Sequence, residues 1–112
     1  MTGVQTCALP ILDGLISGEG NGPLAPLPRE TDWLVFGDDP FAVDAALCHF
    51  MGFAAEKVPI LAHRREFAGA EWGKFELAEL EAEIDGRKIR VADSTINFHF
   101  APAPGWRSHI ER

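Results

Sequence analysis

The first third of the chain alternates apolar runs with glycine- and proline-rich breaks. The run at 12–16 leads into glycines at 18, 20 and 22 followed by Pro23. Because glycine tolerates positive φ, we expect a tight loop over 18–23. Prolines at 26 and 28 predict extended surface chain over 24–30, since each lacks a backbone donor and restricts its predecessor. The apolar run at 33–36 then predicts a short buried strand.

A helix is predicted to begin at Asp39-Pro40. Aspartate is a good N-cap acceptor, and proline at the first helical position leaves no donor unsatisfied. The helix should run to about Met51, with Gly52 as its left-handed stop. Its apolar positions cover much of its surface, so it should be largely buried, and Asp44 then lies inside an apolar helix.

The next segments carry weaker signals. A second, half-exposed helix should start near Val58-Pro59 and end at about Phe67, before Gly69. Residues 74–93 fit either a helix or a hairpin about Asp85-Gly86, and we favour the hairpin. Beyond them, apolar residues at 96, 98 and 100 alternate with polar ones, which predicts a half-buried strand before the prolines at 102 and 104.

The order of these elements predicts an α/β or α+β domain with a strand–helix core and a β-rich C-terminal part. Apolar residues make up 46% of the 112 positions, which is enough for one small core. No apolar run approaches the roughly 18 residues of a membrane span, so we expect a soluble domain. The net charge of −7, with scattered Lys and Arg, argues against a nucleic-acid partner.

Residues 1–11 resemble an in-frame translation of a common sequencing-adapter oligonucleotide. They lack the basic start and unbroken apolar core of a secretory signal. We therefore expect residues 12–112 to be the C-terminal fragment of a single α/β domain whose N-terminal half precedes Leu12. Cytoplasmic and exported locations both stay open. Such a fragment should expose unpaired strand edges and apolar faces such as that of residues 33–36.

Several short motifs together resemble the C-terminal half of the domain of unknown function family 362. They are Asp13-Gly14, residues 18–23, residues 39–44, residues 51–53 and the tail at 105–111. Some members of that family carry a ferredoxin-like iron–sulfur module, and some carry a twin-arginine export signal. The resemblance therefore implies a redox-associated parent. Without Cys7 the chain has only Cys48, so no iron–sulfur cysteine motif lies within it, and its cofactor stays open.

The predicted glycine loop is the first candidate binding site. Its consecutive backbone N–H groups suit a small anionic ligand, as in glycine-rich nests. The alternative is a structural turn that needs positive φ, because the glycine spacing is not that of a dinucleotide site and a carboxylate within the loop would repel an anion. The candidate residues are Gly18, Glu19, Gly20, Asn21 and Gly22.

Three helix residues complete the candidates. Asp39 is interpreted as a structural cap. Asp44 is a weak catalytic or ligand-orienting candidate, since a buried carboxylate needs a partner; the alternative is that it fixes the glycine loop. Cys48 is expected to pack as a small apolar side chain. The dispersed histidines predict no metal site.

These candidates support two hypotheses about function. The first is a protein that binds a small anionic or metal-bound ligand, with a redox association taken from the family resemblance. The second is a noncatalytic scaffold or interaction module in which the glycines are purely structural. The sequence leaves open whether the protein is an enzyme.

Overall fold

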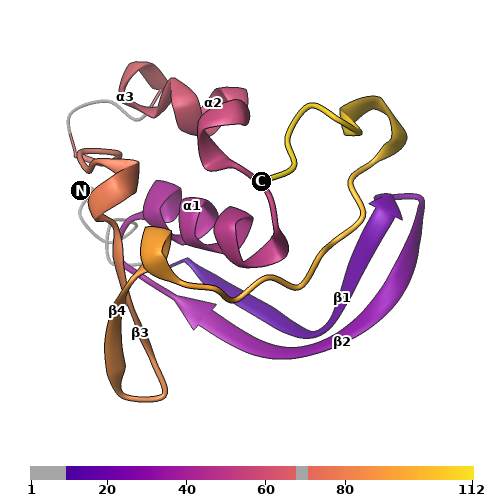
Figure 1. Cartoon of the computed structure of the whole chain (residues 1–112), viewed down its shortest axis with the longest axis horizontal. Helices are drawn as coiled ribbons and strands as arrows, with labels where there is room; N and C mark the ends of the chain where they lie inside the picture. The colour runs from indigo at the N-terminus through magenta and orange to yellow at the C-terminus, as the bar shows by residue number, and fades with distance from the viewer. Residues whose placement is uncertain (1–9, 68–70) are drawn as a thin grey trace, which may run out of the picture.

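The computed structural model describes residues 10–67 and 71–112, which form an α+β domain with two separate two-stranded antiparallel sheets. Figure 1 shows α1 at the centre, with the curved β1–β2 ribbon along one side of it, the short helices α2 and α3 on another, and the β3–β4 hairpin near one end. The predicted strand–helix core is confirmed. In chain order the elements are β1 (Ile11–Asn21), β2 (Ala25–Phe36), α1 (Pro40–Met51), α2 (Pro59–Ala62), α3 (Arg64–Phe67), β3 (Glu81–Ile84) and β4 (Arg87–Arg90).

Helix α1 begins and ends where the sequence predicts. Asp39 Oδ1 accepts the Phe41 N–H at 2.9 Å, and Pro40 occupies the first turn. Gly52 ends the helix with φ of 95°, a value that glycine adopts without steric strain. The helix buries Val43, Ala45, Ala46, Leu47 and Phe50. It is therefore the central element of the core.

The glycine-rich segment is a strand and not the predicted loop. Residues 18–21 continue β1, and the chain turns only at 22–24. Gly18 pairs with Pro28, and Gly20 pairs with Pro26. A Cβ atom on Gly18 would lie 2.9 Å from the Pro26 Cβ, so this glycine is needed for close passage of the opposite strand. Prolines are tolerated here because each strand of a two-stranded ribbon has an unpaired edge.

The strand predicted at 33–36 is confirmed, but it is neither short nor buried throughout. These residues end the long strand β2, and they alternate between the two faces of the ribbon. Trp33 and Val35 are half-buried on the α1 side, whereas Leu34 and Phe36 are each 68% exposed. Only one face of the ribbon is covered, so an uninterrupted apolar run cannot be buried throughout.

The predicted second helix is divided at His63 into α2 and α3. Arg64 Nη1 donates a hydrogen bond to the Leu61 carbonyl at 3.0 Å, and His63 leaves the helical conformation with ψ of 23°. A side chain thus bonds to a carbonyl in the last turn of α2. The predicted stop at Gly69 lies outside the described residues.

The favoured hairpin is confirmed, and the helical alternative for 74–93 is wrong beyond two short 3₁₀ turns, at 77–79 and 91–93. Asp85 and Gly86 take positive φ of 51° and 80° at the two-residue turn, as type I′ geometry requires. The strand predicted around residues 96–100 is absent. Instead Phe98 N donates to Phe50 O at 2.8 Å, and Phe100 N donates to Met51 O at 2.9 Å. This segment lies against the end of a helix, so no ladder forms.

The core consists of three small clusters that contact α1 on different sides. Phe50 and Val91 belong to one of them, and Phe53, Phe100 and Ile110 form another. Trp33 links the ribbon to this core, with ring centroids 6.1 Å from Phe50 and 4.5 Å from Phe98. Each such buried side chain contributes about 1.5–3 kcal/mol, so the folded chain depends on contacts between its two ends.

Candidate functional site

The backbone N–H groups of the predicted glycine site form hydrogen bonds with other atoms of the protein. Gly20 N donates to Ala101 O at 2.9 Å, and Gly22 N donates to Gly20 O at 2.9 Å. Glu19 Oε2 accepts the Ala101 N–H at 2.7 Å and lies 3.2 Å from the Arg29 Nη1. Two of the N–H groups expected to hold an anion are thus occupied by backbone carbonyls. These contacts favour the structural alternative, and ligand binding by residues 18–22 stays a prediction.

The Asp39 carboxylate has the predicted capping role and one more contact. Besides the bond from Phe41, its Oδ1 accepts the Ala42 N–H at 3.4 Å. Its second oxygen, Oδ2, accepts the Gly73 N–H at 2.9 Å. Asp39 therefore fixes both the start of α1 and the segment that precedes β3.

Asp44 is exposed on α1 and does not lie inside the apolar packing as expected. Protein atoms on one side of its carboxyl still raise its pKa above the ordinary value, through partial desolvation. Within the described residues it forms no ion pair, and its catalytic role stays a prediction. One turn later, burial raises the pKa of the Cys48 thiol to about 11, and the Asp44 charge adds to that shift. The thiol is therefore protonated near neutral pH, in line with a packing role.

A hollow of about 330 Å³ lies between α1 and the inner face of the ribbon. Gly18 is the one member of the predicted binding set that lines it, and Asp44 is not among its lining residues. The walls are mainly apolar, with Leu12, Trp33 and Leu47 among them. Ser17 Oγ, the hydroxyl in this wall, already bonds the Thr31 hydroxyl at 2.7 Å. The structure therefore does not bring the predicted glycines and Asp44 together around one cavity.

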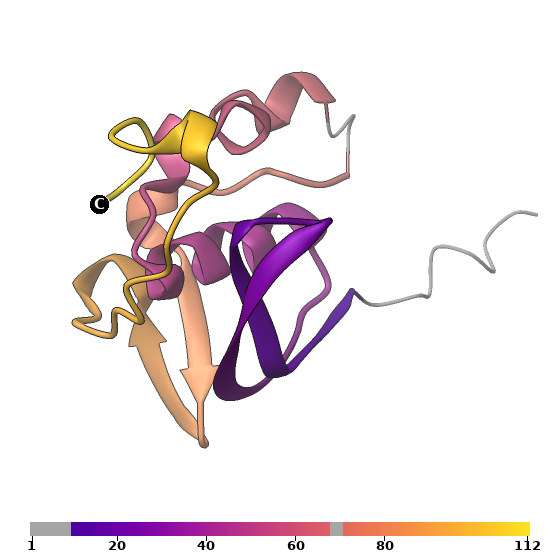
Figure 2. The same ribbon diagram turned by 90° about the vertical axis from the view of Figure 1, so that its right-hand side faces the viewer.

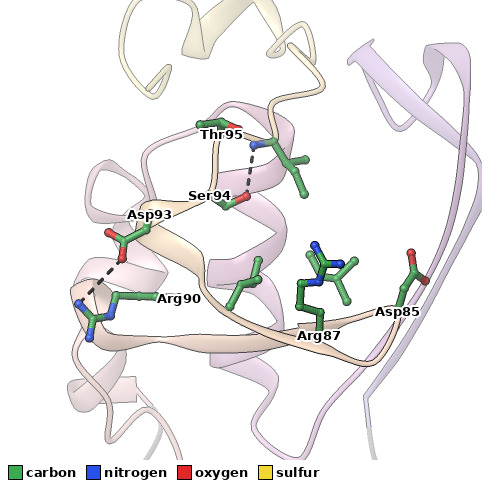
Figure 3. A pocket seen from close by; sticks show the side chains of 9 residues that line it. Asp85, Arg87, Arg90, Asp93, Ser94 and Thr95 are labelled. Atoms are coloured by element: carbon green, nitrogen blue, oxygen red, sulfur yellow. Dashed lines mark hydrogen bonds and ion pairs between the residues drawn. The ribbon is translucent and has the colours of Figure 1, made fainter.

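A larger hollow, of about 670 Å³, lies between the β3–β4 hairpin and residues 93–96 (Figure 3). Its apolar wall consists of Ile84, Ile89 and Ile96. Its polar lining residues are Asp85, Arg87, Arg90, Asp93, Ser94 and Thr95. Arg90 Nη1 lies 4.0 Å from Asp93 Oδ2, which forms a loose, exposed pair at one end. No local sequence pattern indicates this site, because its two walls are brought together only by the tertiary fold.

The outer face of the β1–β2 ribbon is apolar and uncovered. We use the name outer ribbon face for the side turned away from α1, with the exposed side chains of Ile11, Leu34 and Phe36. Each of these three is 68% or 69% exposed. Ile11 lies directly opposite Phe36 in the ladder, and Leu34 is two positions from Phe36 on the same face. In Figures 1 and 2 no described element covers this side of the ribbon.

The described residues contain no cluster of three metal-ligating side chains, and no helix among them is long and apolar enough to cross a membrane. Contiguous exposed apolar patches are typical of interaction surfaces. The outer ribbon face and the hollow of Figure 3 are therefore the two surface features that call for a functional explanation.

Comparison with known proteins gives one informative similarity. No family model and no solved structure matches the chain. The chain is 37% identical over 111 aligned residues to the thylakoid-associated protein sll1697 of Synechocystis sp.. The alignment covers 82% of this chain and 33% of that protein. The chain thus spans about a third of the length of the curated relative that it matches.

Proposed function

We propose that this chain is a noncatalytic docking unit, and that its outer ribbon face packs against another part of a longer polypeptide. The observation that carries the proposal is the exposure of Leu34 and Phe36, each 68%, on a regular strand. Full burial of such a side chain stabilises a protein by about 1.5–3 kcal/mol. A strand that presents several of them to solvent is therefore suited to being covered.

The length of the relative supports an occupant from the same polypeptide. Two-thirds of sll1697 has no counterpart in the alignment, so a chain of this kind occurs within a protein about three times as long. Among the described residues both ribbon strands also have an unpaired edge, because each pairs there with the other alone. Unpaired edges and an uncovered face on one element are expected where further chain completes a sheet.

Charge argues against a second copy as the occupant. Asp13 lies directly opposite Leu34 in the ladder, and Asp32 is exposed two positions before Leu34 on β2. Two such faces packed on each other would bring carboxylates of equal sign together around an apolar centre. The complementary surface is an apolar patch with a basic rim.

The resemblance to the domain of unknown function family 362 extends this proposal. If the longer polypeptide is of that family, the docking unit would support a redox-associated domain that supplies its own cluster ligands. The longer reading frame tests this extension directly. Ferredoxin-type cysteine spacing in it would support the redox association, and its absence would remove the redox part while leaving the docking proposal intact.

Cysteine protection tests the docking proposal. Leu34→Cys and Phe36→Cys are introduced separately, in a background where Cys7 and Cys48 are serine, into the 112-residue chain and into the longer protein encoded at the same locus. Maleimide should label both positions rapidly in the short chain and at least tenfold more slowly in the longer one. Leu24→Cys is the matched control, because Leu24 is 97% exposed at the ribbon turn and should label equally in both.

Two results would overturn the proposal. One is equal labelling of residues 34 and 36 in both proteins, and the other is a locus without a longer reading frame. Self-association of the short chain that Phe36→Glu abolishes would assign the face to a second copy instead. Sedimentation velocity of the short chain distinguishes that outcome.

A further inference from the structure

We infer that the hollow of Figure 3 is a binding site for a short aliphatic monocarboxylate. In this arrangement the Arg87 guanidinium holds the carboxylate, and the isoleucine wall contacts the aliphatic chain. The site lies on the β3–β4 hairpin and not on the ribbon, so it is independent of the proposed docking function.

The hairpin register places a cation on an apolar face. Ile84 and Arg87 are direct partners in the ladder, and Ile89 follows Arg87 by two positions. Side chains of directly paired residues, and of residues two apart, point to the same face of a sheet. Arg87 therefore projects from the same face as the two isoleucines, toward the segment at 93–96. Figure 3 shows its guanidinium directed into the hollow and away from the Arg90–Asp93 pair.

The volume of the hollow suits a small organic ligand. About 670 Å³ falls within the range of roughly 300–1,000 Å³ that is usual for such sites. Apolar walls with a few polar groups are typical of them as well. Here the lining combines three isoleucines with six polar residues, which fits a ligand that has a polar end and an apolar body.

Arg87 is the group available to an anion. In the parts of the chain that the structure describes, its guanidinium takes part in no ion pair or hydrogen bond, whereas Arg90 is close to Asp93. A guanidinium presents parallel N–H donors that match the two oxygens of a carboxylate. Thr95 adds a hydroxyl at the opposite wall. A ligand carboxylate would supply the partner that this cation lacks.

The neighbouring charges limit the ligand to a single negative charge. Asp85 and Asp93 also line the hollow, so its two arginines are balanced by two carboxylates. A dianion such as phosphate would meet repulsion from both sides, with one uncommitted cation to offset it. The three isoleucines favour an aliphatic chain over a polar body.

Hexanoate is the probe, and the readout is a two-dimensional ¹H–¹⁵N NMR titration of the 112-residue chain. We expect saturable shifts in the amides of Arg87, Thr95 and Ile96. Arg87→Gln should weaken binding about tenfold, as expected for loss of a charge-assisted bidentate contact. Lys88→Gln removes the same charge from the exposed opposite face of β4 and should change the affinity less than twofold.

Further ligands and variants separate the alternatives. Hexanol and inorganic phosphate should each bind at least tenfold more weakly than hexanoate. Hexanol binding equal to hexanoate, or equal affinities of the Arg87→Gln and Lys88→Gln variants, would overturn the inference. So would shifts confined to the ribbon. Arg87→Lys keeps the positive charge but lacks the parallel N–H donors of the guanidinium. We expect this variant to bind hexanoate with an intermediate affinity, even if the glutamine variant folds poorly.

Discussion

Asp39 and Gly73 are joined by a hydrogen bond of 2.9 Å, from the buried glycine amide to Oδ2 of the carboxylate that also caps α1. Asp39→Ala should therefore remove a helix cap and leave a buried donor unsatisfied. We expect it to lower the free energy of unfolding by about 2–3 kcal/mol. Urea denaturation followed by circular dichroism measures this change. Asp38→Ala is the matched control, because Asp38 is exposed beside the cap, and a loss as large as that at Asp39 would contradict the prediction.

Gly52 and Gly86 both have positive φ, of 95° and 80°, but they differ in their surroundings. A Cβ atom on Gly52 would collide with Asn97 Oδ1, which accepts the His99 N–H at 2.8 Å, whereas one on Gly86 would meet open space. Gly86→Ala should cost about 1 kcal/mol of conformational strain. Gly52→Ala should cost at least about 1 kcal/mol more, because the close contact must be relieved by moving Asn97. Thermal unfolding of both variants tests this order, and equal losses would argue against it.

Arg64 is a buried cation, only 7% exposed, that bonds to backbone carbonyls. Its guanidinium donates to Leu61 O and to Phe75 O, and its carbon Cζ lies 4.5 Å from the Phe75 ring centroid. Arg64→Met should lower the free energy of unfolding by about 2–3 kcal/mol, since charged hydrogen bonds are lost and carbonyls stay buried. Arg65→Met removes only an exposed pair with Glu76, so we expect a change below about 0.5 kcal/mol. Guanidinium chloride titrations of both variants measure these two changes in the free energy of unfolding, and equal changes would contradict the prediction.

Cys48 should make stability depend on pH in the alkaline range. The pKa of its thiol is raised from 9.0 to about 11 in the folded protein, so the folded state retains the proton that the unfolded state loses. The free energy of unfolding should therefore fall as pH rises above about 9, and this loss should end above about 11. Cys48→Ala should lack this component. Unfolding curves between pH 8 and pH 11, in a Cys7→Ser background, measure the difference.

The titration of the Cys48 thiol also tests the effect of the Asp44 charge. Asp44→Asn removes a negative charge that raises the pKa of Cys48, so the thiol should ionise at lower pH in this variant. Thiolate absorbance near 240 nm follows that titration, and the chain has no tyrosine to overlap with it. An unchanged or higher thiol pKa in the Asn variant would show that the Asp44 charge has no effect.

The elements that could be predicted are those specified by adjacent residues. Asp39-Pro40 and Gly52 determine the ends of α1, and Asp85-Gly86 determines the hairpin turn, because capping and turn geometry depend on a few positions. The ribbon could not be predicted in the same way. Taken alone, the glycines at 18 and 20 predict a loop. In the structure they are strand residues that pair with the prolines at 28 and 26, and a local pattern does not show such a pairing.

The candidate sites were harder to predict for a related reason. Leu34 and Phe36 are apolar like their neighbours, and only the single-sided cover of the ribbon leaves them exposed. The Arg87 site depends on which face of the hairpin packs against residues 93–96, and no local sequence pattern predicts which face that is. Asp44 was expected to be buried because the helix is apolar, yet it occupies an outward position on it.

The contact between Glu19 and Ala101 gives the chain a particular order of assembly. The two residues are 82 positions apart, and Ala101 is bonded both to the Glu19 carboxylate and to Gly20 N. Closing so long a loop costs more entropy than forming α1 or the β3–β4 turn, which need only neighbouring residues. The tip of the ribbon should therefore attach last during folding and detach first during local opening. Until that closure occurs, the ribbon is held to the core at its Trp33 end, and its tip is open to contact with another surface.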